Sequence, residues 1–181
     1  MEITDVFKDF KKSLKRTSAY GNPQKYMCES AIEVIDFDRA KEIYSKTLNL
    51  KKMPTSNDAL YIDVENKHYV FIEFKSGDYS KINILQKMYD SIIIFLELCQ
   101  LKGISVDFDF CRKNISYILV YNEGKGKSSR EEIKKYLVDK TSLKELKLFD
   151  LMYYEGYLLK AIHTYTVDEF KEKFLNIIES K

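Results

Sequence analysis

The alternation of apolar and polar residues predicts a β-hairpin in the first half of the chain. Two apolar runs, Ala59–Val64 and Tyr69–Phe74, are separated by the turn-forming residues Glu65–Lys67. Short runs that are rich in Val, Ile, Tyr and Phe, on either side of such a break, are typical of two paired strands. The pattern therefore predicts a hairpin with a tight turn inside this break.

The register of the hairpin decides which charged side chains meet. A two-residue turn that places Glu65 opposite His68 also places Asp58 opposite Lys75. Side chains alternate between the two faces of a strand, so Glu73 and Lys75 point the same way. Asp58 shares their face, because directly opposite residues lie on one face. The prediction is that two carboxylates and a lysine converge at the open end of the hairpin.

These charges interrupt a strand that is otherwise apolar on both faces. Such strands are usually buried on both sides, and charged residues occur there chiefly when they are paired or bind a metal. Two interpretations of Glu73 and Lys75 stay open on the spacing alone: a functional cluster, or a structural ion pair near the end of a strand. Asp63 belongs to neither, because it lies near the turn and on the other face.

Periodicity along the rest of the chain predicts further helices and strands. The predicted helices are an amphipathic helix within residues 1–20, a helical region over Tyr26–Leu50, a well-buried helix over Ser80–Leu101, a helix from Arg130 to about Asp139, and a C-terminal helix over Val167–Ile178. The predicted strands are Ile104–Phe110, Ile115–Tyr121, and a hairpin of Leu146–Tyr154 with Tyr157–Ile162. Thr166 and Glu169 form a capping box for the last helix. The fold class that follows is a mixed α/β domain.

Composition limits the classes of protein to which the chain can belong. Its 181 residues are enough for one domain with a sizeable core. With 45% hydrophobic and 32% charged residues, the chain has the composition of a globular protein rather than a disordered one. The net charge of +2 gives no overall basic signal for nucleic acid. Any binding of nucleic acid must therefore depend on a local patch.

The cysteines and the apolar runs point to a cytoplasmic protein. Cys28, Cys99 and Cys111 match no metal-binding spacing and no disulfide framework, so we expect reduced, buried thiols. The charged N-terminus has no signal-peptide pattern. The longest apolar run, Ser91–Leu98, is too short to cross a membrane. The expectation is a cytoplasmic location and no membrane partner.

The sequence from Asp58 through a second strand to Glu73-Phe74-Lys75 resembles the PD-(D/E)XK nuclease superfamily. In that superfamily an Asp opens one strand, (D/E)-x-K closes the next, and a long helix follows, as the predicted helix over Ser80–Leu101 does here. The resemblance covers the chain from about Tyr26 to Tyr121. It implies a restriction-endonuclease-like α/β fold, with a mixed β-sheet flanked by helices, in a single domain over residues 1–181 on which the helix within residues 1–20 packs.

The chain departs from the superfamily pattern in two respects. Asn57, rather than a proline, directly precedes Asp58, and Pro54 lies further back. The superfamily core usually has three strands before the long helix, whereas two are evident in this sequence. A first strand would have to lie near Leu50–Pro54 or be displaced.

The resemblance implies a Mg²⁺- or Mn²⁺-dependent nuclease that hydrolyses DNA. Asp58 and Glu73 would be the metal ligands, because Mg²⁺ prefers hard carboxylate oxygens. Lys75 would position or activate the attacking water, or stabilise developing negative charge. The spacing of Glu73 and Lys75 suits these roles, since residues two apart on a strand share a face. The resemblance also allows a homodimer, because dimerisation is common in the superfamily.

Auxiliary residues are implied by the same resemblance. A glutamate from the first helix can join the metal site in the superfamily, and Glu29 is preferred here over Glu33, which lies four residues away on the same predicted helix face. Related nucleases often place a Gln or Lys near the start of the long helix to contact the scissile phosphate. Gln86 and Lys87 hold that position in this chain.

Other functions compete with the nuclease hypothesis. The main alternative is a non-catalytic module on a nuclease-like fold that binds nucleic acid or a protein. A purely structural ion pair is another. A nucleotide-binding P-loop is disfavoured, because Tyr121 stands where the motif ending in Gly126-Lys127-Ser128 requires a glycine.

Overall fold

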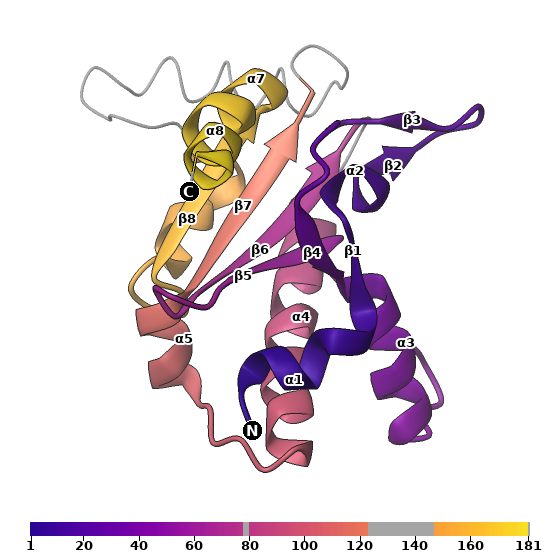
Figure 1. Ribbon diagram of the computed structural model, residues 1–181, viewed down its shortest axis with the longest axis vertical. Helices are drawn as coiled ribbons and strands as arrows, with labels where there is room; N and C mark the ends of the chain where they lie inside the picture. The colour runs from indigo at the N-terminus through magenta and orange to yellow at the C-terminus, as the bar shows by residue number, and fades with distance from the viewer. Residues whose placement is uncertain (78–79, 123–146, 181) are drawn as a thin grey trace.

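A mixed β-sheet forms the centre of the structure (Figure 1). The computed structural model describes residues 1–77, 80–122 and 147–180, and within them six strands pair in the order β1-β4-β5-β6-β7-β8. These strands are β1 (Lys11–Ser13), β4 (Glu33–Asp36), β5 (Ala59–Asp63), β6 (His68–Lys75), β7 (Ile115–Tyr121) and β8 (Ala161–Thr166). Strands β1, β4, β5 and β6 pair antiparallel, whereas β6, β7 and β8 pair parallel. The predicted α/β class is confirmed.

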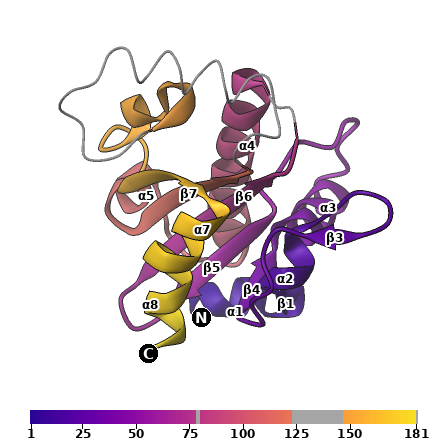
Figure 2. The same cartoon turned by 90° about the horizontal axis from the view of Figure 1, so that it is seen from above.

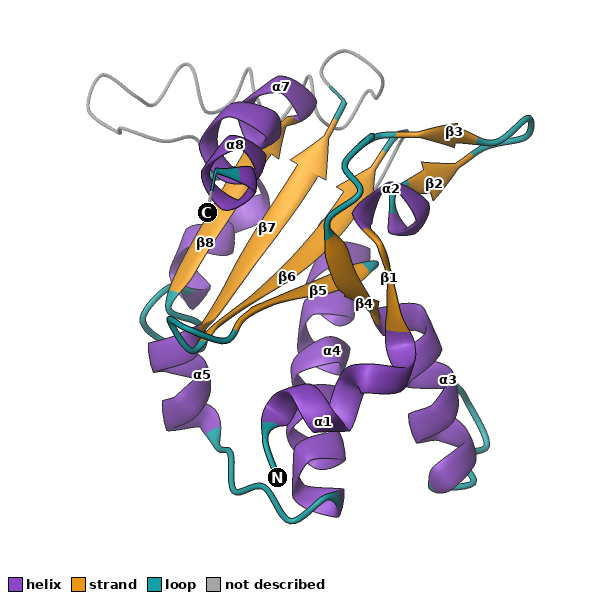
Figure 3. Cartoon of the chain, in the orientation of Figure 1, coloured by secondary structure: helices purple, strands orange, loops and turns teal. Residues whose placement is uncertain are grey.

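Helices cover both faces of this sheet, with α4 on one side and the C-terminal helix on the other (Figure 2). The elements on the α4 face are α1 (Ile3–Phe7), the 3-10 helix η1 (Lys8–Phe10), α3 (Phe37–Thr47), α4 (Lys81–Leu101), α5 (Phe108–Asn114) and the 3-10 helix η2 (Leu148–Tyr154). The elements on the other face are α2 (Leu14–Thr17), α7 (Val167–Phe170), the π-helical η3 (Lys171–Leu175) and α8 (Asn176–Glu179). A short hairpin of β2 (Ala19–Tyr20) and β3 (Lys25–Tyr26) projects beside the sheet (Figure 3).

The sheet separates two apolar cores. Along β6, Tyr69 and Phe71 point to the α4 face, whereas Val70 and Ile72 point to the face covered by the C-terminal helix. All residues of β7 are buried, as expected for a continuous apolar strand between two layers. Every second residue of β6 lies on the same face of the sheet. Glu73 lies two residues after Phe71, so it also points beneath α4.

Helix α4 is fixed at its start by a cap and along its length by packing. The side chain of Ser80 accepts a hydrogen bond from the backbone N–H of Asn83, which satisfies one of the free donors of the first turn. Its inner face buries Ile84, Met88 and Phe95 against the sheet. The helix matches the predicted span of Ser80–Leu101, and β7 and the capping box of Thr166 are also as predicted.

The prediction of one amphipathic helix over residues 1–20 is wrong. The segment divides into α1, η1, strand β1 and α2. Its apolar residues are divided between the two cores: Val6 and Phe7 pack on the α4 face, and Leu14 packs on the other. A single helix at the edge of the sheet could not reach both faces, so the chain crosses as a short strand.

The prediction of a helix over Tyr26–Leu50 is wrong in its first half. Residues 33–36 form β4, and the helix begins only at Phe37, where Asp36 caps it by accepting a hydrogen bond from the backbone N–H of Arg39. Val34 and Ile35 point to opposite faces of the sheet, and each is buried in a different core. Strand β4 thus precedes β5 in the chain and pairs with it, and residues 50–54 form no strand.

Two later strand predictions are also wrong. Residues 104–107 form no strand, and Asp107 caps helix α5 by accepting from the backbone N–H of Phe110. In place of the hairpin predicted over residues 146–162, the described part is the 3-10 helix η2 followed by β8. The predicted helix over residues 130–139 and the basic loop before it lie outside the described residues.

The three cysteines are buried and free, as expected from their spacing. None of the helices within residues 1–77, 80–122 and 147–180 combines the length and apolar character needed to cross a membrane.

Replacing Phe95 should test how far the core beneath α4 supports the fold. Phe95 is fully buried and its ring stacks on Phe7 with centroids 5.5 Å apart. Phe95→Ala should lower the free energy of unfolding by about 3–5 kcal/mol, because it leaves a cavity. Ile93→Ala is the matched control on the exposed side of the same helix, with an expected change below about 0.5 kcal/mol. Urea denaturation measures both, and equal effects would contradict the assignment of the core.

Candidate active site at the open end of the β5–β6 hairpin

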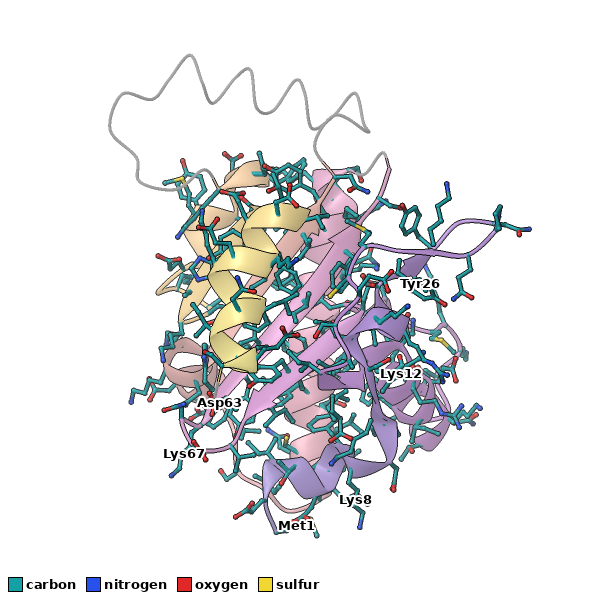
Figure 4. All side chains as sticks on the ribbon, turned by 45° about the horizontal axis from the view of Figure 1, so that its top comes forward. Met1, Lys8, Lys12, Tyr26, Asp63 and Lys67 are labelled. Atoms are coloured by element: carbon teal, nitrogen blue, oxygen red, sulfur yellow. The ribbon has the colours of Figure 1, made fainter. Side chains whose placement is uncertain are left out.

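The hairpin forms, but its register differs from the prediction by two residues. Asp63 pairs with His68, and Ala59 pairs with Ile72. The turn has four residues, 64–67, rather than two, because the Asp63 side chain accepts a hydrogen bond from the backbone N–H of Asn66 and Lys67 adopts a positive φ of 49°. Asp63 and Lys67 mark this turn in Figure 4.

A shift of two residues leaves every side chain on its predicted face. The register that pairs Ala59 with Ile72 brings Asp58 beside Glu73 instead of Lys75. Asp58, Glu73 and Lys75 therefore still gather on the α4 side of the sheet, as predicted. Asp63 lies at the opposite end of the hairpin, also as predicted.

Asp58 is held by hydrogen bonds from the backbone of two neighbouring elements, β6 and α3. Its Oδ2 accepts from the backbone N–H of Phe74 at 2.7 Å, which ties the carboxylate to β6. Its backbone carbonyl accepts from the N–H of Phe37 at 3.4 Å, at the start of α3. Its Oδ1 lies 3.4 Å from Nζ of Lys87 on α4. One oxygen of Asp58 is thus firmly bound, and the other is only weakly engaged.

The three residues that precede Asp58 are each hydrogen-bonded to a side chain of α3 or α4. Thr55 donates from both its backbone N–H and its hydroxyl to Oδ2 of Asp90, at 2.8 and 2.7 Å. The next two bonds are Ser56 Oγ to Asp38 Oδ1 at 2.6 Å and the Asn57 N–H to Ser91 Oγ at 2.8 Å. These bonds fix the path of the chain into β5 and so position Asp58.

Glu73 is the most deeply buried charge of the cluster. Its side chain is 0% exposed, and its Oε1 accepts a hydrogen bond from Nζ of Lys87 at 2.6 Å and forms an ion pair with Nζ of Lys75, also at 2.6 Å. The two lysine side chains are 18% and 24% exposed, so the ammonium groups lie between the carboxylate and solvent. The second oxygen, Oε2, is buried and has no hydrogen-bond partner among the described residues.

The surroundings of Asp58 and Lys87 shift the pKa values of both side chains. Burial, followed by repulsion from Glu73, raises the pKa of Asp58 to about 7, against the attraction of Lys87 and Lys75. Burial alone would lower the pKa of Lys87, but the attraction of Asp58 and Glu73 outweighs burial and raises it. The lysine therefore stays charged, whereas Asp58 titrates near neutral pH.

Asp38 is a third carboxylate near this cluster, and the sequence prediction did not include it. It lies in the first turn of α3, where Ser56 and Nζ of Lys41 each donate to its Oδ1 at 2.6 Å. Burial would raise the pKa of Asp38, but these two hydrogen bonds and the charges of Lys41 and Lys87 together lower it. A possible signal was the helix-capping sequence Asp36-Phe37-Asp38, which places an acid at the start of a helix.

The structure brings one of the predicted auxiliary residues into the cluster. Lys87 contacts both Asp58 and Glu73. Gln86 is exposed instead and lines a separate groove of about 270 Å³ with Met53 and Asp90.

The glutamates predicted to join the metal site from a first helix do not do so. Glu29 lies outside any helix and forms an exposed ion pair with Lys15. Glu33 lies on β4 and pairs with Lys11 on β1. The prediction failed because residues 26–36 are not helical, and the additional carboxylate near the cluster comes from Asp38 of the later helix α3.

Two oxygens are candidates for holding a cation. They are Oδ1 of Asp58, which is weakly engaged, and Oε2 of Glu73, which is unpartnered. No cluster of three or more His, Cys, Asp or Glu residues that could hold a metal is found in the described part of the chain. A donor set of two carboxylates suits Mg²⁺, which usually keeps several water ligands and uses few protein ligands.

Comparisons with known proteins do not assign the chain to a family. No protein-family model, curated protein or solved structure matches the chain. A functional assignment therefore depends on the cluster itself and on the motif that its residues form.

The raised pKa of Asp58 should appear in the pH dependence of stability. The folded pKa of about 7 exceeds the ordinary value of 3.8, so the folded state holds the proton more tightly than the unfolded state. Wild-type protein should therefore lose stability as the pH rises from about 4 to about 7. Asp58→Asn cannot ionise and should not show this loss.

Urea denaturation of both proteins in a chelating buffer, at several pH values, measures the difference. The other titrating groups are common to both proteins, so the gap between the two curves isolates Asp58. Parallel curves for wild type and Asp58→Asn would contradict the prediction.

Proposed function

We propose that this protein is a metal-dependent nuclease that hydrolyses phosphodiester bonds in DNA. The observation that carries the proposal is the convergence of Asp58, Glu73 and Lys75 at the ends of two paired strands, with Glu73 fully buried. The proposed fold is the restriction-endonuclease-like one. Strand β4 supports it, because β4, β5 and β6 are three adjacent strands of the sheet that precede the long helix α4, as the core strands of the superfamily usually do.

The residues present fit a divalent cation. Asp58 and Glu73 repel each other, as the raised pKa of Asp58 reflects, and a cation between them would relieve that repulsion. The unpartnered Oε2 of Glu73 is buried, and an unpaired buried acceptor is costly, so it favours a ligand. When bound, Mg²⁺ or Mn²⁺ would lower the pKa of a bound water and neutralise charge on the phosphate.

The lysines supply the remaining requirements of phosphodiester hydrolysis. An ammonium group has three N–H donors, and that of Lys75 forms an ion pair with Oε1 of Glu73 at 2.6 Å. Its N–H groups can also hold the attacking water or a phosphate oxygen while the phosphorus–oxygen bond to the leaving group breaks. Lys87 and Lys41 supply further ammonium groups nearby, and each of them is paired with a carboxylate.

Titration with Mn²⁺ tests whether the cluster holds a metal. Wild-type protein should gain stability on saturation, by about 2.7 kcal/mol at a hundredfold excess over Kd, because the cation binds the folded state alone. Asp58→Ala should lose this gain. Asp63→Asn is the matched control, since it removes a carboxylate at the far end of the same hairpin, and it should respond as wild type does. A wild-type protein that gains no stability would exclude the metal site.

Replacement of Lys75 tests its role in the reaction separately from metal binding. Lys75→Met should keep Mn²⁺ binding but cleave DNA at least about 100-fold more slowly, because the site loses a charged donor to the transition state. Lys67→Met, at the hairpin turn, should cleave at the wild-type rate. Single- and double-stranded DNA with Mg²⁺ or Mn²⁺ are the substrates. Full activity in Lys75→Met would show that Lys75 takes no part in the reaction.

One observation favours a second candidate function, that of a non-catalytic module that binds nucleic acid or a protein. Lys75 and Lys87 already compensate the charge of Glu73, so the cluster is stable as an ion-pair network. A module of this kind would bind DNA or a protein without metal-dependent stabilisation or cleavage. The Mn²⁺ titration above separates it from the nuclease.

A further inference from the structure

Tyr117 of β7 lies beside Glu73 beneath α4. Strands β6 and β7 pair in parallel, with Phe71 opposite Tyr117 and Glu73 opposite Leu119. Tyr117 is therefore a diagonal neighbour of Glu73, and both lie on the α4 face of the sheet. Diagonal neighbours on a sheet are within reach of an aromatic side chain.

Both side chains carry a buried polar atom that has no partner. Tyr117 and Glu73 are each 0% exposed. The hydroxyl of Tyr117 and the Oε2 of Glu73 have no hydrogen bond among the described residues. Unpartnered buried polar atoms are rare in folded proteins, and two of them on neighbouring residues call for a shared explanation.

A hydroxyl donor and a carboxylate acceptor are complementary. The Tyr117 hydroxyl keeps its proton, because burial and then the charges of Glu73 and Asp58 raise its pKa. One water molecule can accept from this hydroxyl and donate to Oε2, which satisfies both atoms. Asn57, whose backbone N–H donates to Ser91 of α4, is also fully buried, and its two side-chain amide atoms have no partner among the described residues.

We propose that Tyr117 is a positioning residue for Glu73, acting through a buried water molecule that joins its hydroxyl to Oε2. The lysines hold Oε1, and the water bound to Tyr117 occupies one lone pair of Oε2 from within the core, which leaves the second lone pair of Oε2 for the cation. The carboxylate plane is thereby fixed from two directions. This inference rests on the proposed role of Glu73 as a metal ligand, since residues that orient a ligand typically alter metal affinity or activity about 10- to 100-fold.

Removal of one oxygen atom tests the proposal with little change in packing. Tyr117→Phe should weaken Mn²⁺ binding, measured by calorimetry, by about 10-fold or more. Tyr69→Phe is the matched control, because Tyr69 is also buried on the α4 face but lies at the other end of β6, against Phe95 and Phe110. It should bind Mn²⁺ as wild type does. Urea denaturation of each variant verifies that it is folded.

A second measurement needs no metal. The hydroxyl proton of Tyr117 can be followed by NMR in protein with labelled tyrosine, in a chelating buffer. Glu73→Gln should shift this resonance upfield, because the acceptor at the end of the water bridge loses its charge, and should leave the Tyr69 signal unchanged. Either an unshifted Tyr117 proton or wild-type Mn²⁺ affinity in Tyr117→Phe would overturn the proposal.

The two measurements keep this inference distinct from the nuclease assignment. If wild-type protein binds no Mn²⁺, the proposed function fails, and the NMR shift alone decides whether Tyr117 positions Glu73. If wild type binds Mn²⁺ and Tyr117→Phe binds it equally well, the metal site stands and Tyr117 is a core aromatic residue only.

Discussion

The burial of the Glu73 carboxylate is the constraint on which the rest of the site depends. An ionised carboxylate without solvent is tolerated only when other groups compensate its charge. Lys75 reaches it along the same strand and Lys87 reaches it from α4, and both meet one oxygen. The compensation of the Glu73 charge therefore depends on how α4 packs on the sheet. A shift of the helix along the sheet would separate Lys87 from Glu73.

This compensation is incomplete in a way that suits a functional site. The lysines compensate the charge of Glu73, while burial and then repulsion from Glu73 raise the pKa of Asp58. Natural proteins rarely keep two carboxylates so close without a cation or a shared proton, and strongly shifted groups are concentrated at functional sites. The hydrogen bonds of residues 55–57 to α3 and α4 hold Asp58 in this unfavourable position.

Some of this arrangement could be predicted from the sequence. The faces of Asp58, Glu73 and Lys75 follow from strand alternation alone, so they survived an error of two residues in register. The register itself depends on a turn shaped by a hydrogen bond between Asp63 and Asn66, which alternation does not encode.

Strand β4 escaped prediction for a related reason. It has four residues and runs directly into α3, so its pattern merges with that of the helix. Asp38 and the polar residues before Asp58 were missed because they act through bonds to partners up to 35 positions away. No local pattern in the sequence carries that information.

The residues that build the cluster and hold it in place all lie between positions 37 and 91, although the sheet extends well beyond them. Loops that join such nearby segments cost little entropy to close, so this interval can gather its charged groups early in folding. The strands and helices outside it contribute burial, with Tyr117 as the proposed exception. The charged groups of the site thus lie in one interval of the chain, and the residues that bury the site lie largely outside it. Sequence change can proceed faster in the enclosing part, where apolar residues can replace one another, than in the part that holds the charges.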